Sequence, residues 1–279
     1  QLPQAALDAM QPGENGVLYT MKLNTRYDEA AGTLSINPSN VVKMRYKAKR
    51  SGSDTTGDVG DYWLGYETSV ATLGGYAYLG SNDGFLQCIN LNTMELVWAQ
   101  DTKDDTNGSP VLELDLPNRA AYIYIGCSLH FTADSDKLGS VPFMKVNAIT
   151  GEVVWKYEQQ VSTKSGVSGG IQATALLGKN SISDLVIVPF ARTPTEDAGV
   201  LVALDKATMN VRWTFPMEKY TWSSPVAVYD DAGNAYIVVC EGSDTGGKVF
   251  LLDGRTGTLL STFDAEKNIE ASPAVYGNT

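Results

Sequence analysis

The chain has 279 residues, of which 43% are hydrophobic and 19% charged, a composition typical of a globular protein with a substantial core. Its formal net charge of -11 argues against nucleic acid as a main partner and against docking on an anionic membrane, because phosphate binding needs clustered Lys and Arg. No apolar run approaches the roughly 18 residues that span a bilayer, so no transmembrane segment is predicted.

Read from the N-terminus, the chain alternates short apolar strands with turn residues. Residues 1–15 are predicted to be an N-terminal extension. Residues 16–48 contain three predicted strands without an inner strand, and residues 269–279 contain an inner strand with nothing after it. Between them lie four predicted four-stranded blades, at 67–100, 108–158, 170–216 and 222–264. This order predicts an all-β fold, a β-propeller of four-stranded antiparallel blades with a split or truncated fifth, as one domain over residues 16–279.

The second half of each blade carries one signature: an apolar strand, Asp or Asn, two residues, Thr, a turn residue and a strand that closes with Trp in three copies. The Asp or Asn is expected to cap the turn, Thr to add a local hydrogen bond and Gly to supply the backbone angle. Met94 and Met209 replace that Gly, so those two turns are expected to differ. We interpret the Trp as packing over the turn of its own or a neighbouring blade. The signature residues are Asn90, Trp98, Asn147, Trp155, Asp205, Trp213 and Asp253.

Each predicted blade begins with a short strand of small residues. This strand is predicted to be innermost, where the strands converge on the axis and have little room. Proline is tolerated there because it begins a strand. The predicted inner strands are 67–71, 108–112, 172–176, 223–227 and 271–275.

Two arrangements of the ends remain open. The first and last segments complete one blade and close a five-bladed ring, which removes two exposed sheet edges. Alternatively, the chain is a fragment of a seven- or eight-bladed propeller.

Cysteine and histidine give little support for catalysis. The three cysteines are an odd number and lie in or beside strand-like runs, so they are expected to be small buried apolar side chains. No Cys-x-x-Cys pair exists, and His130 is the chain's one histidine. A His-based zinc site or a Ser–His–Asp triad would have to use that residue.

The runs Ala203–Trp213 and Asn147–Trp155 resemble the pyrroloquinoline-quinone-like propeller repeat, although Met209 departs from its Gly. That repeat occurs in quinoprotein dehydrogenases and in non-enzymatic relatives such as outer-membrane assembly lipoprotein B. The resemblance covers residues 16–279 and implies the propeller and an extracytoplasmic location. For a dehydrogenase it would also imply calcium held by Glu, Asn and Asp near the axis, a catalytic Asp and often a vicinal cysteine pair. No cysteines here are adjacent, and no residue matches a motif for the catalytic Asp.

Loops from every blade converge on a propeller axis, which makes the axial channel the expected binding place. Glu67 and Glu270 are candidate ligands for a cation such as calcium, but solvated carboxylates are commoner and no metal site is predicted. Trp222 suits stacking on a sugar, and packing between blades explains it equally well. The predicted axial residues are Glu67, Gln172, Trp222, Ser223 and Glu270.

We therefore predict a non-enzymatic, extracytoplasmic propeller that acts as a binding scaffold for a protein partner or within an oligomeric assembly. One alternative is a quinoprotein oxidoreductase, or a fragment of one, that uses pyrroloquinoline quinone and calcium. A further alternative is a carbohydrate-binding propeller with a glycan partner.

Overall fold

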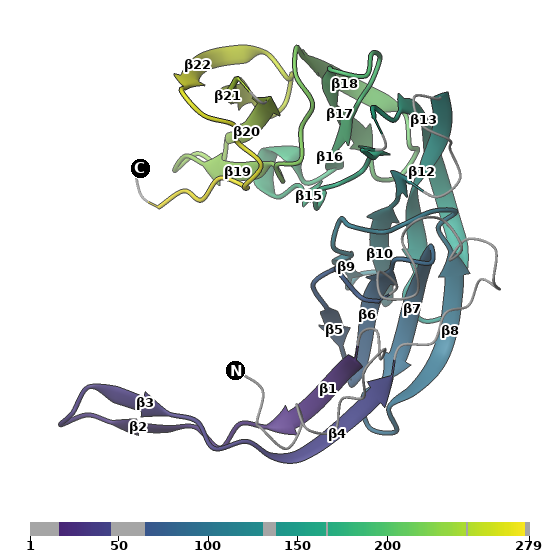
Figure 1. Cartoon of the computed structure of the whole chain (residues 1–279), viewed down its shortest axis with the longest axis vertical. Coiled ribbons are helices and arrows are strands. Elements are labelled where there is room, and N and C mark those ends of the chain that lie inside the picture. The colour runs from purple at the N-terminus through teal and green to yellow at the C-terminus, as the bar shows by residue number, and fades with distance from the viewer. Residues whose placement is uncertain (1–16, 46–64, 131–137, 166, 244, 277–279) are drawn as a thin grey trace.

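The computed structural model describes residues 17–45, 65–130, 138–165, 167–243 and 245–276. The predicted extension at 1–15 lies outside them. Four antiparallel sheets follow one another along a curved arc (Figure 1), each with its strands in chain order. The all-β fold and the four-stranded propeller blades are confirmed. No described helix is long and apolar enough to cross a membrane.

The first, second and fourth blades are regular meanders. The first consists of β5 (Ala71–Leu73), β6 (Tyr76–Ser81), β7 (Phe85–Asn90) and β8 (Glu95–Asp101). The second consists of β9 (Val111–Asp115), β10 (Ala120–Gly126), β12 (Leu138–Asn147) and β13 (Val153–Ser162). The fourth consists of β19 (Val226–Tyr229), β20 (Ala235–Ser243), β21 (Gly246–Asp253) and β22 (Leu259–Ala265).

The third blade is joined to the second by hydrogen bonds. Its own strands are β15 (Leu176–Leu177), β16 (Leu185–Ala191), β17 (Gly199–Asp205) and β18 (Val211–Met217), with the 3-10 helix η3 (Asn180–Ile182) between β15 and β16. The short strand β14 (Gly169–Gly170) pairs with β16 and also with β11 (Ser128–Leu129), which follows β10 of the second blade. These pairings fix the two blades relative to one another.

The N-terminal segment forms four strands where three were predicted. β1 (Val17–Lys22) pairs with β4 (Ser39–Arg45), while β2 (Arg26–Asp28) and β3 (Thr33–Ser35) form a hairpin that projects from the arc (Figure 1). Leu18 and Met44 pack against the first blade. Residues 266–276 contain no strand and lie at the other end of the arc (Figure 1), so the number of blades and the domain boundary stay predictions.

Hydrophobic cores lie between adjacent blades. One cluster packs the first blade on the second, including Tyr78 and Ile123. A larger one packs the second on the third through Phe143 and Phe190, and another packs the third on the fourth. Each blade is therefore stabilised by its neighbours rather than by a core of its own.

The predicted inner strands begin too early. The observed strands start at residues 71, 111, 176 and 226, and 271–275 is not a strand. The residue two positions ahead of each observed strand instead donates its backbone N–H to a Ser or Thr hydroxyl at 2.9 to 3.1 Å. In the first three blades that hydroxyl precedes the inner strand of the next blade, and in the fourth it lies in the segment after β22. We call this series the hydroxyl belt; its members are Ser69, Ser109, Thr174, Ser224 and Ser272.

The belt predicts a specific cost for removing one hydroxyl. Thr174→Val keeps the side-chain shape but leaves the half-buried N–H of Ser109 without its acceptor. We expect the free energy of unfolding to fall by about 1–2 kcal/mol, measured by chemical denaturation. Thr262→Val, at an exposed threonine on β22, is the matched control. Equal stability of the two variants would contradict a role for the belt.

The signature turns share one geometry. In each, Oδ1 of the Asp or Asn accepts the backbone N–H groups two and three residues later, as Asp205 does from Ala207 and Thr208 at 2.9 Å. The expectation that the Met turns differ was wrong. Met94 (φ 55°) and Met209 (φ 64°) adopt the left-handed conformation of Gly, and both turns keep their hydrogen bonds. This backbone conformation costs a non-glycine residue roughly 1 kcal/mol.

Each signature Trp covers the turn of the following blade. Trp155 Nε1 donates to the carbonyl of Lys206 at 3.0 Å, and Trp213 Nε1 donates to that of Gly254 at 3.2 Å. Trp98 lies against Gly151. The structure thus decides between the two packing partners that the sequence left open.

Candidate functional site

A cavity of about 370 Å³ opens at the upper end of the arc, where loops of the second, third and fourth blades meet the segment after β22. Its volume lies within the range of small-molecule sites. The lining residues are Lys164, Ser165, Val167, Arg192, Asp197, Lys219, Tyr220, Trp222 and Glu270. We call it the Arg192 cavity.

Arg192 is the most deeply buried charged side chain of this cavity, at 5% exposed. Its Nε donates to the carbonyl of Ser168 at 3.2 Å and its Nη1 to that of Glu196 at 2.7 Å. The guanidinium also lies 4.9 Å from the ring centre of Tyr220. No carboxylate in the described part of the chain forms an ion pair with it. Because buried charges are normally paired, this cation is unusual.

The Arg192 backbone explains how the side chain reaches the cavity. Arg192 follows β16 at φ 59°, a left-handed conformation that costs a non-glycine residue energy. Its carbonyl accepts hydrogen bonds from the backbone N–H and the hydroxyl of Ser162, and its N–H bonds to Ala198 across the β16–β17 turn. The turn therefore holds the guanidinium in one place.

Two aromatic rings form one wall of the cavity. Tyr220 and Trp222 have ring centroids 5.3 Å apart at an interplanar angle of 49°. Trp222 Nε1 is buried, and no described residue accepts its hydrogen bond. An indole N–H usually finds a partner when buried, so the hydrogen-bonding capacity of this donor is unmet among the described residues.

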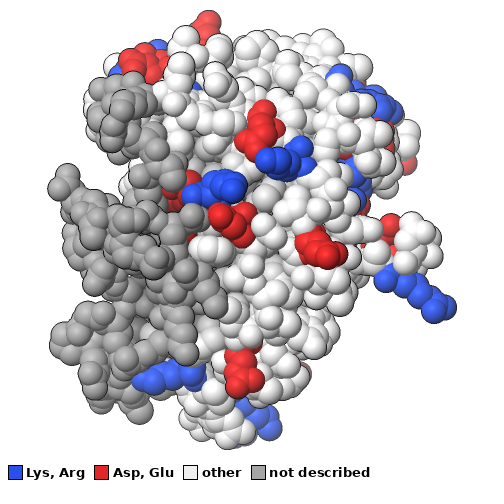
Figure 2. Space-filling view, turned by 90° about the vertical axis from the view of Figure 1, so that its right-hand side faces the viewer, with Lys and Arg blue, Asp and Glu red and all other residues white. Residues whose placement is uncertain are grey.

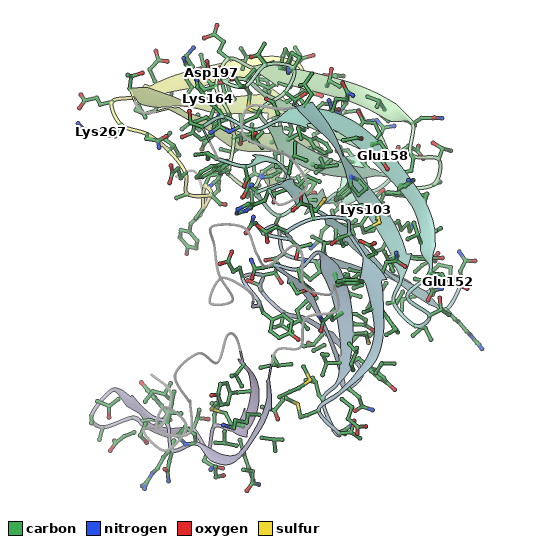
Figure 3. The ribbon with its side chains drawn as sticks, turned by 45° about the vertical axis from the view of Figure 1, so that its right-hand side comes forward. Lys103, Glu152, Glu158, Lys164, Asp197 and Lys267 are labelled. Atoms are coloured by element: carbon green, nitrogen blue, oxygen red, sulfur yellow. The ribbon has the colours of Figure 1, made fainter. Side chains whose placement is uncertain are left out.

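Charged side chains of both signs line the rest of the cavity. Lys164 forms ion pairs with Asp197 at 2.5 Å and Glu196 at 3.6 Å, and Figure 3 shows Lys164 and Asp197 side by side at the upper end of the arc. Lys219 forms no ion pair within the described residues. Glu270 accepts a hydrogen bond from Asn268 at 2.9 Å. On the outer face seen in Figure 2, charges of both signs are likewise interspersed.

The structure separates the five predicted axial residues. Trp222 and Glu270 line the Arg192 cavity. Ser223 is fully buried. Gln172 lies towards the second blade, where it accepts a hydrogen bond from Asn107 at 3.0 Å. Glu67 is exposed and precedes the first blade, whereas Glu270 follows the fourth blade.

Glu67 and Gln172 border a second polar cluster around buried Asp105. Its carboxylate accepts hydrogen bonds from Asn82 and Asn107, both at 2.9 Å, and lies 3.3 Å from His130 Nδ1. The hydrogen bond with Asp105 raises the pKa of His130, although burial opposes it, and Asp104 and Glu67 raise it further.

This raised pKa predicts a pH dependence of stability. The folded protein holds the His130 proton more tightly than the unfolded chain, so the stabilisation is complete below the unfolded pKa of about 6.5 and is lost as pH rises through the folded value. His130→Gln should remove that loss. Denaturation of both proteins between pH 5.5 and 8.5 tests it, and parallel curves would contradict the assignment.

The cysteines are poor nucleophiles in this fold. Burial raises the pKa of Cys88 to about 11, and burial also raises those of Cys127 and Cys240. All three are buried and unpaired, in the first, second and fourth blades respectively. A buried neutral thiol is inert compared with a thiolate.

The described residues do not fit the calcium and quinone site that a dehydrogenase relationship implies. They contain no group of three or more His, Cys, Asp or Glu side chains placed to hold a metal ion. Of the two acidic candidates, Glu67 precedes the first blade and Glu270 follows the fourth, and no two cysteines share a blade. No reaction step can be derived through that cofactor.

Comparison with known proteins shows which family the chain belongs to. The family model described as outer membrane protein assembly factor BamB matches residues 50–216, more than half of the chain. The chain belongs to this family. The match confirms the pyrroloquinoline-quinone-like propeller relationship expected from the repeat. No curated protein matches the chain.

Solved structures similar to this BamB-family chain include three dehydrogenases. A europium-containing methanol dehydrogenase has a TM-score of 0.56 at 13% identity, covering 89% of this chain and 49% of that one. Quinohemoprotein alcohol dehydrogenase ADHIIG from Pseudomonas putida HK5 has a TM-score of 0.55 at 17% identity, with 90% and 40% covered. Quinohemoprotein alcohol dehydrogenase from Comamonas testosteroni has 0.50 at 15%, with 73% and 36% covered. The chain spans less than half of each, and the likeness shows the fold alone.

Apart from Glu270, sequence reasoning missed the charged residues of the Arg192 cavity. Arg192, Lys219 and Asp197 lie in loops, where single charged residues are usually solvated. The one available signal was the length of the segment from Arg192 to Gly199, which exceeds a tight hairpin turn.

Proposed function

We propose that this BamB-family chain is a non-enzymatic, extracytoplasmic binding scaffold whose ligand face includes the Arg192 cavity. The observation that carries the proposal is the combination of a buried, unpaired guanidinium with an indole donor that has no protein partner among the described residues. The guanidinium donates to two backbone carbonyls but has no carboxylate among the described residues paired with its charge, and a buried charge is costly unless it is paired. A buried donor without an acceptor is costly too, and a bound anion would compensate the guanidinium charge.

The location and the protein partner rest on the family. Its description names an outer membrane protein assembly factor, which supports an extracytoplasmic place and a protein partner or an assembly for this chain. The sheet-rich arc offers loops of several blades on one side, a common arrangement for recognition surfaces.

The competing function is a quinoprotein oxidoreductase, and one experiment separates the two. The full chain is titrated calorimetrically with pyrroloquinoline quinone, with and without calcium, and then assayed for dye-linked oxidation of primary alcohols. We expect neither saturable heat nor turnover. Calcium-dependent saturable binding together with alcohol-dependent dye reduction would overturn the proposal.

A further inference from the structure

The polar groups that line the Arg192 cavity indicate which class of ligand it binds. They are of three kinds: two cations without ion pairs in the described chain, an indole donor and two carboxylates. Each kind recognises a different chemical group, so together they restrict the ligand class.

The cations select an anion. The Arg192 guanidinium is buried and held by two backbone carbonyls, so it is already oriented before a ligand arrives. Pre-organised guanidinium groups bind carboxylates and phosphates with strong, directional hydrogen bonds. Lys219 adds a second positive charge at the same cavity.

The carboxylates limit the charge that the ligand can carry. Asp197 and Glu270 line the same space, and Glu196 lies close by, with its carbonyl bonded to Arg192. The carboxylates of Asp197 and Glu270 are exposed, and because like charges repel, a dianionic phosphate is disfavoured relative to a carboxylate with one charge. The same two residues are acceptors suited to ligand hydroxyl groups.

The aromatic wall favours a ligand with an apolar face. Tyr220 and Trp222 present ring surface beside the polar groups, and burying apolar area against them is favourable. A pyranose ring has an apolar C–H face that can pack on these rings and hydroxyls at its edge, and Trp222 Nε1 has no acceptor among the described residues.

We propose that the Arg192 cavity binds an acidic saccharide, in which a hexuronate carboxylate contacts Arg192 and Lys219 while its ring packs on Trp222. The hydroxyls of the sugar donate to Asp197 and Glu270. This assignment rests on the proposed scaffold function and names the ligand class of that same site.

The test is calorimetric titration of the full chain with cellobiouronate and with cellobiose, its neutral match. We expect saturable binding of the acidic disaccharide and at least about tenfold weaker binding of cellobiose, because the charge-assisted hydrogen bonds are lost. Equal affinity for the two sugars, or no binding of either, would overturn the proposal. Displacement of the uronate by an equal concentration of inorganic phosphate would show a general anion site and overturn it too.

Variants localise the binding. Arg192→Gln also removes hydrogen bonds to the carbonyls of Ser168 and Glu196 and can disturb the fold. Two milder variants, Lys219→Gln and Trp222→Phe, are therefore measured beside it. Lys219→Gln should weaken binding of the acidic disaccharide by about three- to tenfold without changing that of cellobiose. Trp222→Phe keeps a ring but removes the donor, and should weaken binding of both.

Lys179→Gln is the matched control, because it removes the same charge from an exposed lysine before η3 that does not line the cavity. It should leave the affinity unchanged. If Lys219→Gln and Trp222→Phe fold and behave like this control, the assignment to the cavity is wrong. If the chain binds neither the sugars nor the quinone, only the proposed ligand class is rejected. If it binds the quinone with calcium and then reduces the dye with alcohol, the scaffold function is rejected.

Discussion

Replacing Glu113 with Gln should lower the free energy of unfolding by about 3–5 kcal/mol. Glu113 on β9 lies between two blades, where it accepts hydrogen bonds from Lys206 Nζ and Tyr124 OH, both at 2.6 Å. Lys145 Nζ lies 3.2 Å from the same carboxylate. The two lysine side chains are only 11% and 16% exposed. Without the carboxylate, two largely buried ammonium groups face each other uncompensated.

The Glu113 site also predicts acid sensitivity. Burial by itself raises the pKa of Glu113, but hydrogen bonds from Lys206 and Tyr124 and the charge of Lys145 outweigh it and lower the pKa below its ordinary value. The stabilisation is therefore present above the unfolded pKa of about 4.3 and is lost as pH falls through the folded value. The stability difference between wild type and Glu113→Gln should narrow below about pH 4.

Glu158→Gln provides the control for Glu113. Glu158 pairs with Lys156 at 2.9 Å on β13, but the two side chains are 41% and 56% exposed. A surface pair of this kind contributes about 0–1 kcal/mol. Chemical denaturation at neutral pH measures both variants. A loss below about 1 kcal/mol for Glu113→Gln would show that the interblade network does not stabilise the fold.

Replacing Gly257 with Ala should cost about 2–4 kcal/mol of stability. Gly257 follows Asp253 in the fourth signature turn at φ 72°. A Cβ atom there would lie 2.6 Å from Cε3 of Trp213, whose side chain is 8% exposed and hydrogen-bonded to Gly254. The substitution therefore adds backbone strain and a clash with a large ring that has little room to move.

Gly74→Ala separates the two contributions. Gly74 has φ 54°, and no atom of a described neighbour lies within 4 Å of the position that a Cβ would occupy, so this variant carries the backbone strain without the clash. We expect a loss of about 1 kcal/mol. Thermal or chemical denaturation compares the two, and equal losses would show that the Trp213 ring yields freely.

Much of the architecture is readable in the sequence because its signals are local. The Asp or Asn of each signature bonds to N–H groups two and three residues later, as Asn147 does with Ile149 and Thr150, so residue type and spacing alone predict the turn. The apolar strands that alternate with these turns predict the four-stranded blade. The Met94 turn was misjudged because the sequence does not show that buried packing around Met94 offsets its strained backbone.

The starts of the inner strands depend on contacts between blades. Ser109 and Thr174 read as strand residues, but the N–H of Ser109 bonds to the hydroxyl of Thr174 in the next blade and not to a strand partner. Only the assembled arc brings these groups together.

The sequence by itself determined the blades, their turns and the family, because these depend on hydrogen bonds and apolar patterns within a few residues. The tertiary structure alone decided which turn each Trp covers and which residues form the Arg192 cavity. Arg192, Lys219 and Glu270 are far apart in the chain and meet because three blades curve around one axis. Arg192 is buried without an ion pair among the described residues, and this is a property of that packing that has no counterpart in residue order.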